Sequence, residues 1–117
     1  MIGFRVFTGV ALCLAWSACK PSAEVVTVTD TPAQVLYKHG KSVYQSYCTS
    51  CHNSDPKKNG AVGPDVFGSS KELIEARVLR AAYPPGYTPK RKSGVMVALP
   101  YLKKDIDALY AYLNDLQ

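Results

Sequence analysis

A cysteine pair followed directly by a histidine is the group of side chains in this sequence best suited to chemistry. The group comprises Cys48, Cys51 and His52. Positions i, i+3 and i+4 share one face of a helical turn, so the three side chains can reach one planar group. This pattern is typical of c-type haem attachment, in which both thiols form thioethers and the imidazole binds the iron. Two cysteines and a histidine can also ligate zinc, so both chemistries are open at this point.

A second axial ligand would have to come from a small set of side chains. After residue 18 the chain contains one methionine, Met96, and two histidines, His39 and His52. A thioether ligand favours ferrous iron and raises its potential, which suits an electron carrier. The alternatives are ligation by His39, an open iron position, or a Met96 that only fills an apolar gap.

The N-terminal segment has the layout of a secretory signal peptide, which we assign to residues 1–18. Arg5 is the only charge before a mostly apolar run at 6–16, which is too short to span a bilayer comfortably. The residues before Cys19 resemble a bacterial lipoprotein box, although Trp16 departs from it. We expect Cys19 to be a lipid anchor, with a freely soluble periplasmic protein as the alternative.

The charge and the cysteines narrow the function classes. Of the 14 Lys and Arg only Arg5 precedes residue 20, while all 9 Asp and Glu follow it, so the exported chain carries a modest and dispersed positive charge. Nucleic acid is therefore not an expected partner. A disulfide between Cys48 and Cys51 would close too short a loop to add much stability, so this pair is expected to serve chemistry.

The sequence predicts about three helices and no sheet, which makes the fold class all-α. We expect a linker at 19–33 and a domain at 34–117. Thr31, Pro32 and Gln34 form the start signal of a helix that runs towards Tyr47. Its expected buried face is Leu36, Gly40, Val43, Tyr44 and Tyr47.

Two further helices are expected after the cysteine pair. A capping box of Ser69 and Glu72 opens one that continues to about Ala82. The last covers about 104–116, with an apolar stripe formed by Ile106, Leu109, Tyr110, Leu113 and Leu116. A domain this small buries little apolar surface, and its loops are long, so a bound haem would complete its core.

The domain at 34–117 resembles a class I mono-haem cytochrome c. Gly40 and Tyr44 stand eight and four residues before Cys48, Gly63-Pro64 follows the motif, and Met96 lies just before the closing helix. The sequence departs from the family where Val97-Ala98-Leu99 separates Met96 from Pro100, and where Lys103 takes the usual cap position.

The resemblance implies roles for these positions. Gly40 and Tyr44 would pack the first helix on the last, against Leu109 and Tyr110 or Tyr112. The Pro64 carbonyl would accept the proton of the second His52 nitrogen and so orient the ring. Met96 would be the distal ligand. One haem c, covalent through Cys48 and Cys51, would then transfer electrons between redox proteins of the bacterial envelope.

Several expectations concern the surroundings of the haem. The candidates for holding its propionates are Tyr83, Tyr87, Arg80, Lys90 and Arg91. The two basic runs, 90–92 and 57–58, are expected to form a rim that attracts an acidic redox partner, or else ordinary solvated loops. We expect His39 to be a helix-surface histidine.

The rival functions differ in class. A five-coordinate haem enzyme or gas sensor follows if Met96 does not bind. A structural zinc module would use Cys48, Cys51, His52 and His39. The domain could also be a haem subunit of a larger periplasmic dehydrogenase or oxidase complex. The preferred prediction is an electron carrier and not an enzyme, as a monomer or as such a subunit.

Overall fold

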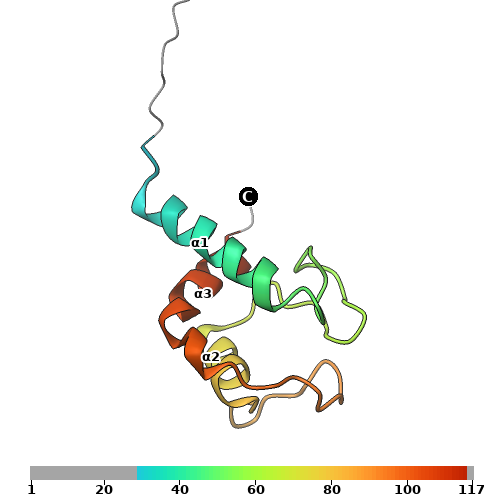
Figure 1. Ribbon diagram of the computed structural model, residues 1–117. Coiled ribbons are helices and arrows are strands. Elements are labelled where there is room, and N and C mark those ends of the chain that lie inside the picture. Colours follow the sequence, from blue (N-terminus) through green and yellow to red (C-terminus); the bar gives the residue numbers. More distant parts are fainter. Residues whose placement is uncertain (1–28, 116–117) are drawn as a thin grey trace, which may run out of the picture.

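The computed structural model describes residues 29–115 and contains three α-helices and one 3-10 helix (Figure 1). The order is α1 (Pro32–Tyr47), α2 (Lys71–Arg80), η1 (Pro100–Asp105) and α3 (Ile106–Asn114). Over these residues no strand is formed. The expected all-α class with three helices is therefore confirmed.

The start of α1 follows the predicted capping box. The Thr31 hydroxyl accepts from the Gln34 backbone N–H at 3.3 Å, and the Gln34 side chain accepts from the Thr31 N–H at 2.8 Å. Pro32 fills the first helical position, where its missing N–H removes no bond. These contacts fix the entry of the chain into the domain.

Helix α1 crosses α3 at Gly40, which explains why a glycine is needed there. A Cβ on Gly40 would lie 1.9 Å from the Ala108 carbonyl oxygen. Next to the crossing, the rings of Tyr44 and Tyr112 pack with their centroids 5.4 Å apart. The expected packing against Leu109 and Tyr112 is present, whereas Tyr110 is exposed.

The prediction for the two ends of the α1 face is wrong. Gly40, Val43 and Tyr44 are buried, but Leu36 and Tyr47 are 40% and 47% exposed. Because the helices cross at an angle around Gly40 (Figure 1), side chains a turn away from the crossing diverge from the partner helix.

Helix α2 begins and ends differently from the prediction. Ser70, and not Ser69, caps it, with its hydroxyl accepting from the Leu73 N–H at 3.2 Å. The Ser69 hydroxyl instead donates to the Val66 carbonyl at 2.6 Å. The helix ends at Arg80 because Ala81 adopts a left-handed conformation with φ 52°.

The closing helix is preceded by a 3-10 turn that the sequence pattern does not indicate. Pro100 opens η1, and α3 starts at Ile106, two residues later than expected. The predicted stripe residues Ile106, Leu109 and Leu113 are buried, whereas Tyr110 of the same stripe is exposed, so the prediction is wrong there. With Val43, Tyr44, Ile74, Val78, Leu102 and Tyr112 the three buried stripe residues form the core.

Three predictions fall wholly or largely outside the described residues. These are the signal peptide at 1–18, the lipid anchor at Cys19 and most of the linker at 19–33; Leu116 of the predicted stripe is likewise not described. Between residues 29 and 115, no helix is long and apolar enough to cross a membrane.

Candidate functional site

The cysteine pair continues directly from the end of α1. Cys48 is the C-cap of that helix, and its N–H donates to the Tyr44 carbonyl at 2.9 Å. The N–H groups of Cys51 and His52 then both donate to the Cys48 carbonyl, at 3.2 and 2.9 Å. The motif thus forms one further turn at the end of α1, as the spacing predicts. Its position is therefore set by the position of α1.

A buried tyrosine holds the chain that follows the motif. The Tyr44 hydroxyl donates to the Asn53 carbonyl at 2.6 Å. Burial, with Cys48 and Tyr112 nearby, raises the pKa of Tyr44 well above its ordinary value. Tyr44 therefore remains neutral at physiological pH and keeps its proton for this bond.

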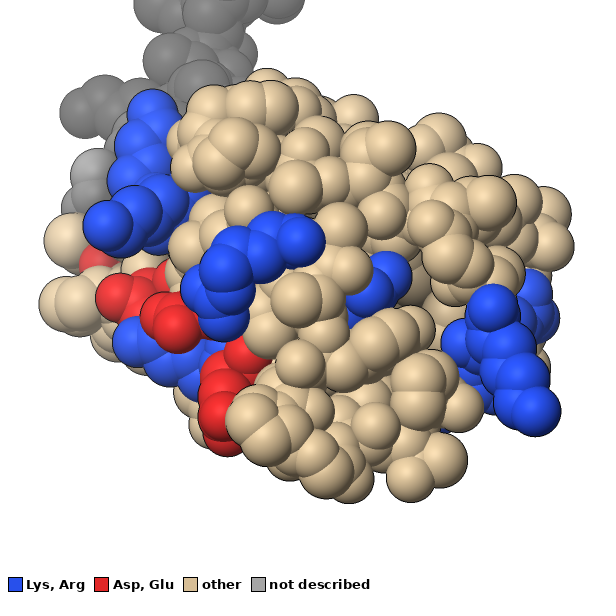
Figure 2. All heavy atoms as spheres, turned by 90° about the horizontal axis from the view of Figure 1, so that it is seen from below, with Lys and Arg blue, Asp and Glu red and all other residues tan. Residues whose placement is uncertain are grey.

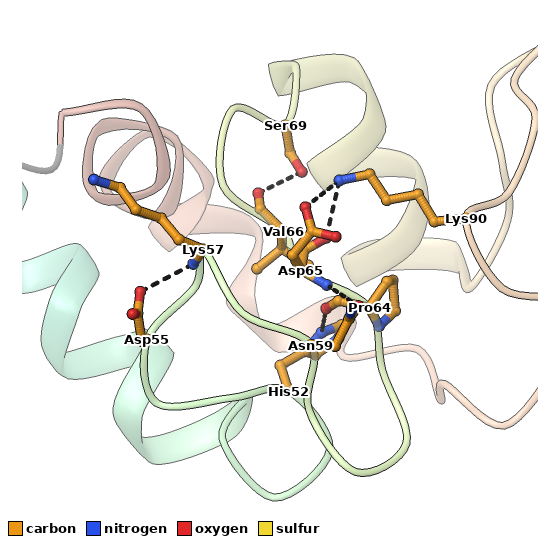
Figure 3. Close-up of polar contacts among 9 residues, drawn as sticks. All are labelled: His52, Asp55, Lys57, Asn59, Pro64, Asp65, Val66, Ser69 and Lys90. Atoms are coloured by element: carbon orange, nitrogen blue, oxygen red, sulfur yellow. Dashed lines mark hydrogen bonds and ion pairs between the residues drawn. The ribbon is translucent and has the colours of Figure 1, made fainter.

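The His52 ring is fixed by a backbone acceptor, as the resemblance implies. Its Nδ1 lies 2.8 Å from the Pro64 carbonyl oxygen (Figure 3). Because a carbonyl can only accept, Nδ1 carries a proton, so the neutral ring has its lone pair on Nε2. Such a bond orients a metal-binding imidazole and increases its basicity.

The loop around His52 leaves no room for larger residues. A Cβ on Gly63 would lie 2.5 Å from the ring atoms Cε1 and Nδ1, and one on Gly60 would lie 2.3 Å from the Cys51 carbonyl oxygen. The N–H groups of Val62 and Gly63 donate to that same carbonyl, at 3.2 and 2.9 Å. Both glycines are therefore required by close approach to the motif.

Met96 and the attachment motif line the same cavity. Cys48, Cys51, His52 and Pro64 line it together with Met96, and its empty space, counted out to the open mouth, is about 1290 Å³. Met96 is partly buried and packs against the core, while Val95 and Val97 beside it are 62% and 69% exposed. The structure thus brings all five predicted haem-site residues of the domain to one cavity.

The two cysteine thiols are free and differ in exposure. Cys51 is exposed, and Cys48 is partly buried. Burial, with a smaller effect of Cys51, raises the pKa of the Cys48 thiol to about 11. Without a group bound to it, Cys48 is therefore a protonated thiol at neutral pH.

His39 lies outside this cavity. Its Nε2 is 2.7 Å from Oδ1 of Asp105, which is only 5% exposed. The imidazole thereby links α1 to the junction of η1 and α3. His39 lies on the surface of α1, as predicted, and its ring contacts Asp105. Within residues 29–115, no group of three or more His, Cys, Asp and Glu side chains is placed to hold a metal ion.

Polar and aromatic side chains also line the cavity. Tyr83 and Tyr87 stack with centroids 5.4 Å apart, and the Arg77 guanidinium lies 4.1 Å from the Tyr83 ring centroid. Of the five propionate candidates, Tyr83, Tyr87, Lys90 and Arg91 line the cavity, but Arg80 lies in a separate groove beside η1.

Arg77 is a cavity residue that sequence reasoning missed. It follows Leu73 and Ile74 at spacings of four and three, and all three line the cavity. That spacing was visible in the sequence, but it does not account for Arg80, which stands three residues further on at the end of α2 and does not line the cavity. The Arg77 Nη1 donates to the Ala81 carbonyl at 2.7 Å, so its head group is already oriented.

Most side chains of the two basic runs, 90–92 and 57–58, already contact other residues of the domain, so few remain to form the predicted rim. Lys90 pairs with Asp65, Arg91 donates to the Val62 carbonyl, Lys58 lies 3.4 Å from Asp55, and Lys57 lies over the Phe67 ring. Figure 2 shows that Lys and Arg on the face seen from below stand apart, with a few acidic side chains gathered on one side. Dispersed charge of this kind suits a weak protein encounter better than nucleic acid.

The residues present fit a covalent haem. Two thiols stand on one turn, an oriented imidazole follows them, and a thioether lies on the same cavity, which has a mainly apolar lining. Guanidinium and phenol groups that line the cavity suit the carboxylates of such a group.

Comparison with known proteins supports this assignment. Searches of curated proteins and of solved structures gave no significant match. A family model described as cytochrome c oxidase, cbb3-type, subunit III matches residues 35–113. This match covers most of α1 and α3 and every residue that lines the cavity. A cytochrome c domain implies covalent haem c and electron transfer. The chain therefore belongs to the family of cytochrome c oxidase cbb3-type subunit III.

Proposed function

We propose that this chain is an electron carrier with one haem c, attached through Cys48 and Cys51 and ligated by His52 and Met96. The observation that carries this proposal is the Nδ1–Pro64 hydrogen bond of 2.8 Å, which leaves Nε2 of His52 free to bind, on a cavity that Met96 also lines. Two such ligands close the iron to substrates, so the function is electron transfer and not catalysis on a small molecule.

The chain's residues would hold the axial ligands in place and set the reduction potential of the iron. When bound, the haem supplies an iron that accepts and releases one electron. The Pro64 carbonyl keeps His52 in one tautomer, and the Met96 thioether favours the ferrous state. Because α1 and α3 are locked at Gly40, the attachment turn keeps its position in both oxidation states, and little structural change accompanies transfer.

We further propose that the domain works in the periplasm, after removal of residues 1–18, with Cys19 as a lipid anchor to the envelope membrane. Cytochrome c domains are typically extracytoplasmic. The net positive charge and the exposed Cys51 at the cavity mouth support a brief encounter with an acidic redox protein. Mass spectrometry of the mature N-terminus tests the anchor: a lipidated Cys19 supports it, and an unmodified terminus elsewhere excludes it.

A second candidate is a dedicated haem subunit of a larger oxidase complex. The family match favours it, since the matching model describes an oxidase subunit. Purification from native membranes under mild detergent separates the two. At physiological ionic strength a free carrier elutes alone, because salt screens its encounter with an acidic partner, whereas a subunit co-elutes with fixed partners in a constant ratio.

The ligation is tested by absorption spectroscopy of the purified holoprotein in both oxidation states. Met96→Ala should lose six-coordinate low-spin character and keep the haem attached, and Cys48→Ser with Cys51→Ser should lose covalent haem. The matched control is Val97→Ala, an exposed neighbour of Met96. An unchanged Met96→Ala spectrum would rule out Met96 as a ligand. Rapid and complete carbon monoxide binding by the unmodified protein at neutral pH would instead indicate a five-coordinate haem protein.

A further inference from the structure

Two basic side chains of the loop after α2 bind the segment 62–65. Lys90 donates from Nζ to the Asp65 carbonyl at 3.2 Å and forms an ion pair with the Asp65 carboxylate (Figure 3). Arg91 donates from Nη1 to the Val62 carbonyl at 2.9 Å. Both contacts join stretches of chain that lie far apart in the sequence.

On its other side, the same segment supports the attachment motif. The Pro64 carbonyl accepts from His52, and the Gly63 N–H donates to the Cys51 carbonyl at 2.9 Å. The segment 62–65 therefore lies between two parts of the site. One is the turn that bears His52, and the other is the loop that bears Met96.

The Met96 loop depends on such contacts because it has no regular structure of its own. Between Arg80 and Pro100 no helix or strand forms. The loop is tied at its far end by the Leu99 N–H, which donates to the Val78 carbonyl at 2.6 Å. Met96 thus lies between the tie at Leu99 and the contacts of Lys90 and Arg91, next to exposed valines that add little packing.

We infer that Lys90 and Arg91 are positioning residues that fasten the Met96 loop to the segment supporting His52. Both axial ligands then share one scaffold, and opening of the loop requires release of the Lys90–Asp65 pair. This inference rests on the proposed ligation by Met96. Lys90 and Arg91 of the basic run 90–92 would then hold the Met96 loop and would not serve to attract a redox partner.

The pair is partly exposed, so each contact is individually weak. The side chains of Lys90 and Asp65 are 45% and 35% exposed, and salt screens such a pair. However, the free energy needed to open the Met96 loop is only a small part of the free energy of global unfolding. One weak contact can therefore change how often this loop opens. We expect loss of the pair to increase loop opening about fivefold.

The test measures cyanide uptake by the oxidised holoprotein at saturating cyanide, where opening of the Met96 loop limits the rate. Lys90→Met removes the ammonium and keeps the stem, and Asp65→Asn removes the carboxylate charge. Each should accelerate uptake about fivefold. The double variant should be no faster than either single variant, because the two residues act as one pair. Lys90→Arg should restore a slow rate.

A matched control is Lys92→Met, which makes the same change in charge. Lys92 is exposed and forms no ion pair or side-chain hydrogen bond with a described residue. Its uptake rate should equal that of the unmodified protein. Higher salt should accelerate the unmodified protein and leave Lys90→Met nearly unchanged.

Three results would overturn the inference. The first is a Lys90→Met rate equal to that of Lys92→Met. The second is acceleration by Lys90→Met but not by Asp65→Asn, which would place the Lys90 ammonium on the haem carboxylates instead. The third is uptake by the unmodified protein as fast as by Met96→Ala; this alone also removes the proposed Met96 ligation, so the two failures are distinguishable.

Discussion

Replacing Gly40 with alanine should destabilise the domain by forcing α1 and α3 apart. The added Cβ would lie 1.9 Å from the Ala108 oxygen and 2.9 Å from the Tyr112 Cβ, whereas contacts below 3.0 Å are essentially never tolerated. The two closest atoms are the carbonyl oxygen and carbon of Ala108, so a rotamer change cannot relieve the clash, and the helices must separate by about 1 Å.

The magnitude follows from two opposing effects. Overpacking of a tight contact costs about 3 kcal/mol, while alanine in a helix interior is favoured over glycine by about 1 kcal/mol. The net loss should therefore be about 2 kcal/mol, a large share of the stability of a domain this small. Gly40→Ala is destabilising only if the cost of overpacking exceeds the gain from the higher helix propensity of alanine.

The assay is urea unfolding of fully haem-loaded protein, followed by far-ultraviolet circular dichroism. Gly94→Ala is the control, because a Cβ there meets nothing within 4 Å and its φ is not in the left-handed region. It should leave the unfolding free energy within about 0.5 kcal/mol of the original. A Gly40→Ala protein as stable as Gly94→Ala would refute the argument that backbone contact at Gly40 fixes the helix crossing.

Three further substitutions test other parts of the structure. His39→Ala leaves the buried Asp105 carboxylate without its side-chain partner and should lower the free energy of unfolding in urea by about 1–3 kcal/mol. The control is Lys38→Ala, which breaks an exposed pair with Asp30 and should cost under about 0.5 kcal/mol. Equal losses in the two variants would contradict this prediction. Gly63→Ala should push the His52 ring off the Pro64 carbonyl, with an altered haem spectrum and covalent attachment retained; an unchanged spectrum would show that the loop yields instead. Burial raises the pKa of Tyr44 above its ordinary value of 10.0, so the unfolded chain ionises first and this stabilisation is lost as pH rises above about 10. Tyr44→Phe should therefore lose less stability between pH 8 and 11 than the unmodified protein, and parallel curves would exclude a role for Tyr44 ionisation.

The local signals of the sequence predicted the parts of the fold that depend on neighbouring residues. The capping box at Thr31 and the turn formed by Cys48, Cys51 and His52 depend on contacts within about four residues. Helical periodicity predicted the buried face of α3 in part, since Tyr110 of the predicted stripe is exposed. The glycine at the helix crossing was identified through the family resemblance, and its contact with Ala108 was not.

The remaining features depend on tertiary contacts that no local pattern encodes. The shift of the cap from Ser69 to Ser70 follows from the Ser69–Val66 hydrogen bond. The exposure of Tyr47 follows from the angle between α1 and α3, and the pairing of Lys90 with Asp65 joins residues 25 positions apart. Arg77 was predictable from helical spacing, but its stacking on Tyr83 required the loop to return over α2.

The unequal construction of the two walls of the cavity has a consequence for how such domains diversify. The attachment wall is an extension of a helix locked to another helix, so substitutions there disturb the whole core. The methionine wall is one irregular stretch between Arg80 and Pro100, tied to the rest at few points. The stretch between Arg80 and Pro100 is therefore the part of the cavity in which a change of length or composition disturbs the packed helices least.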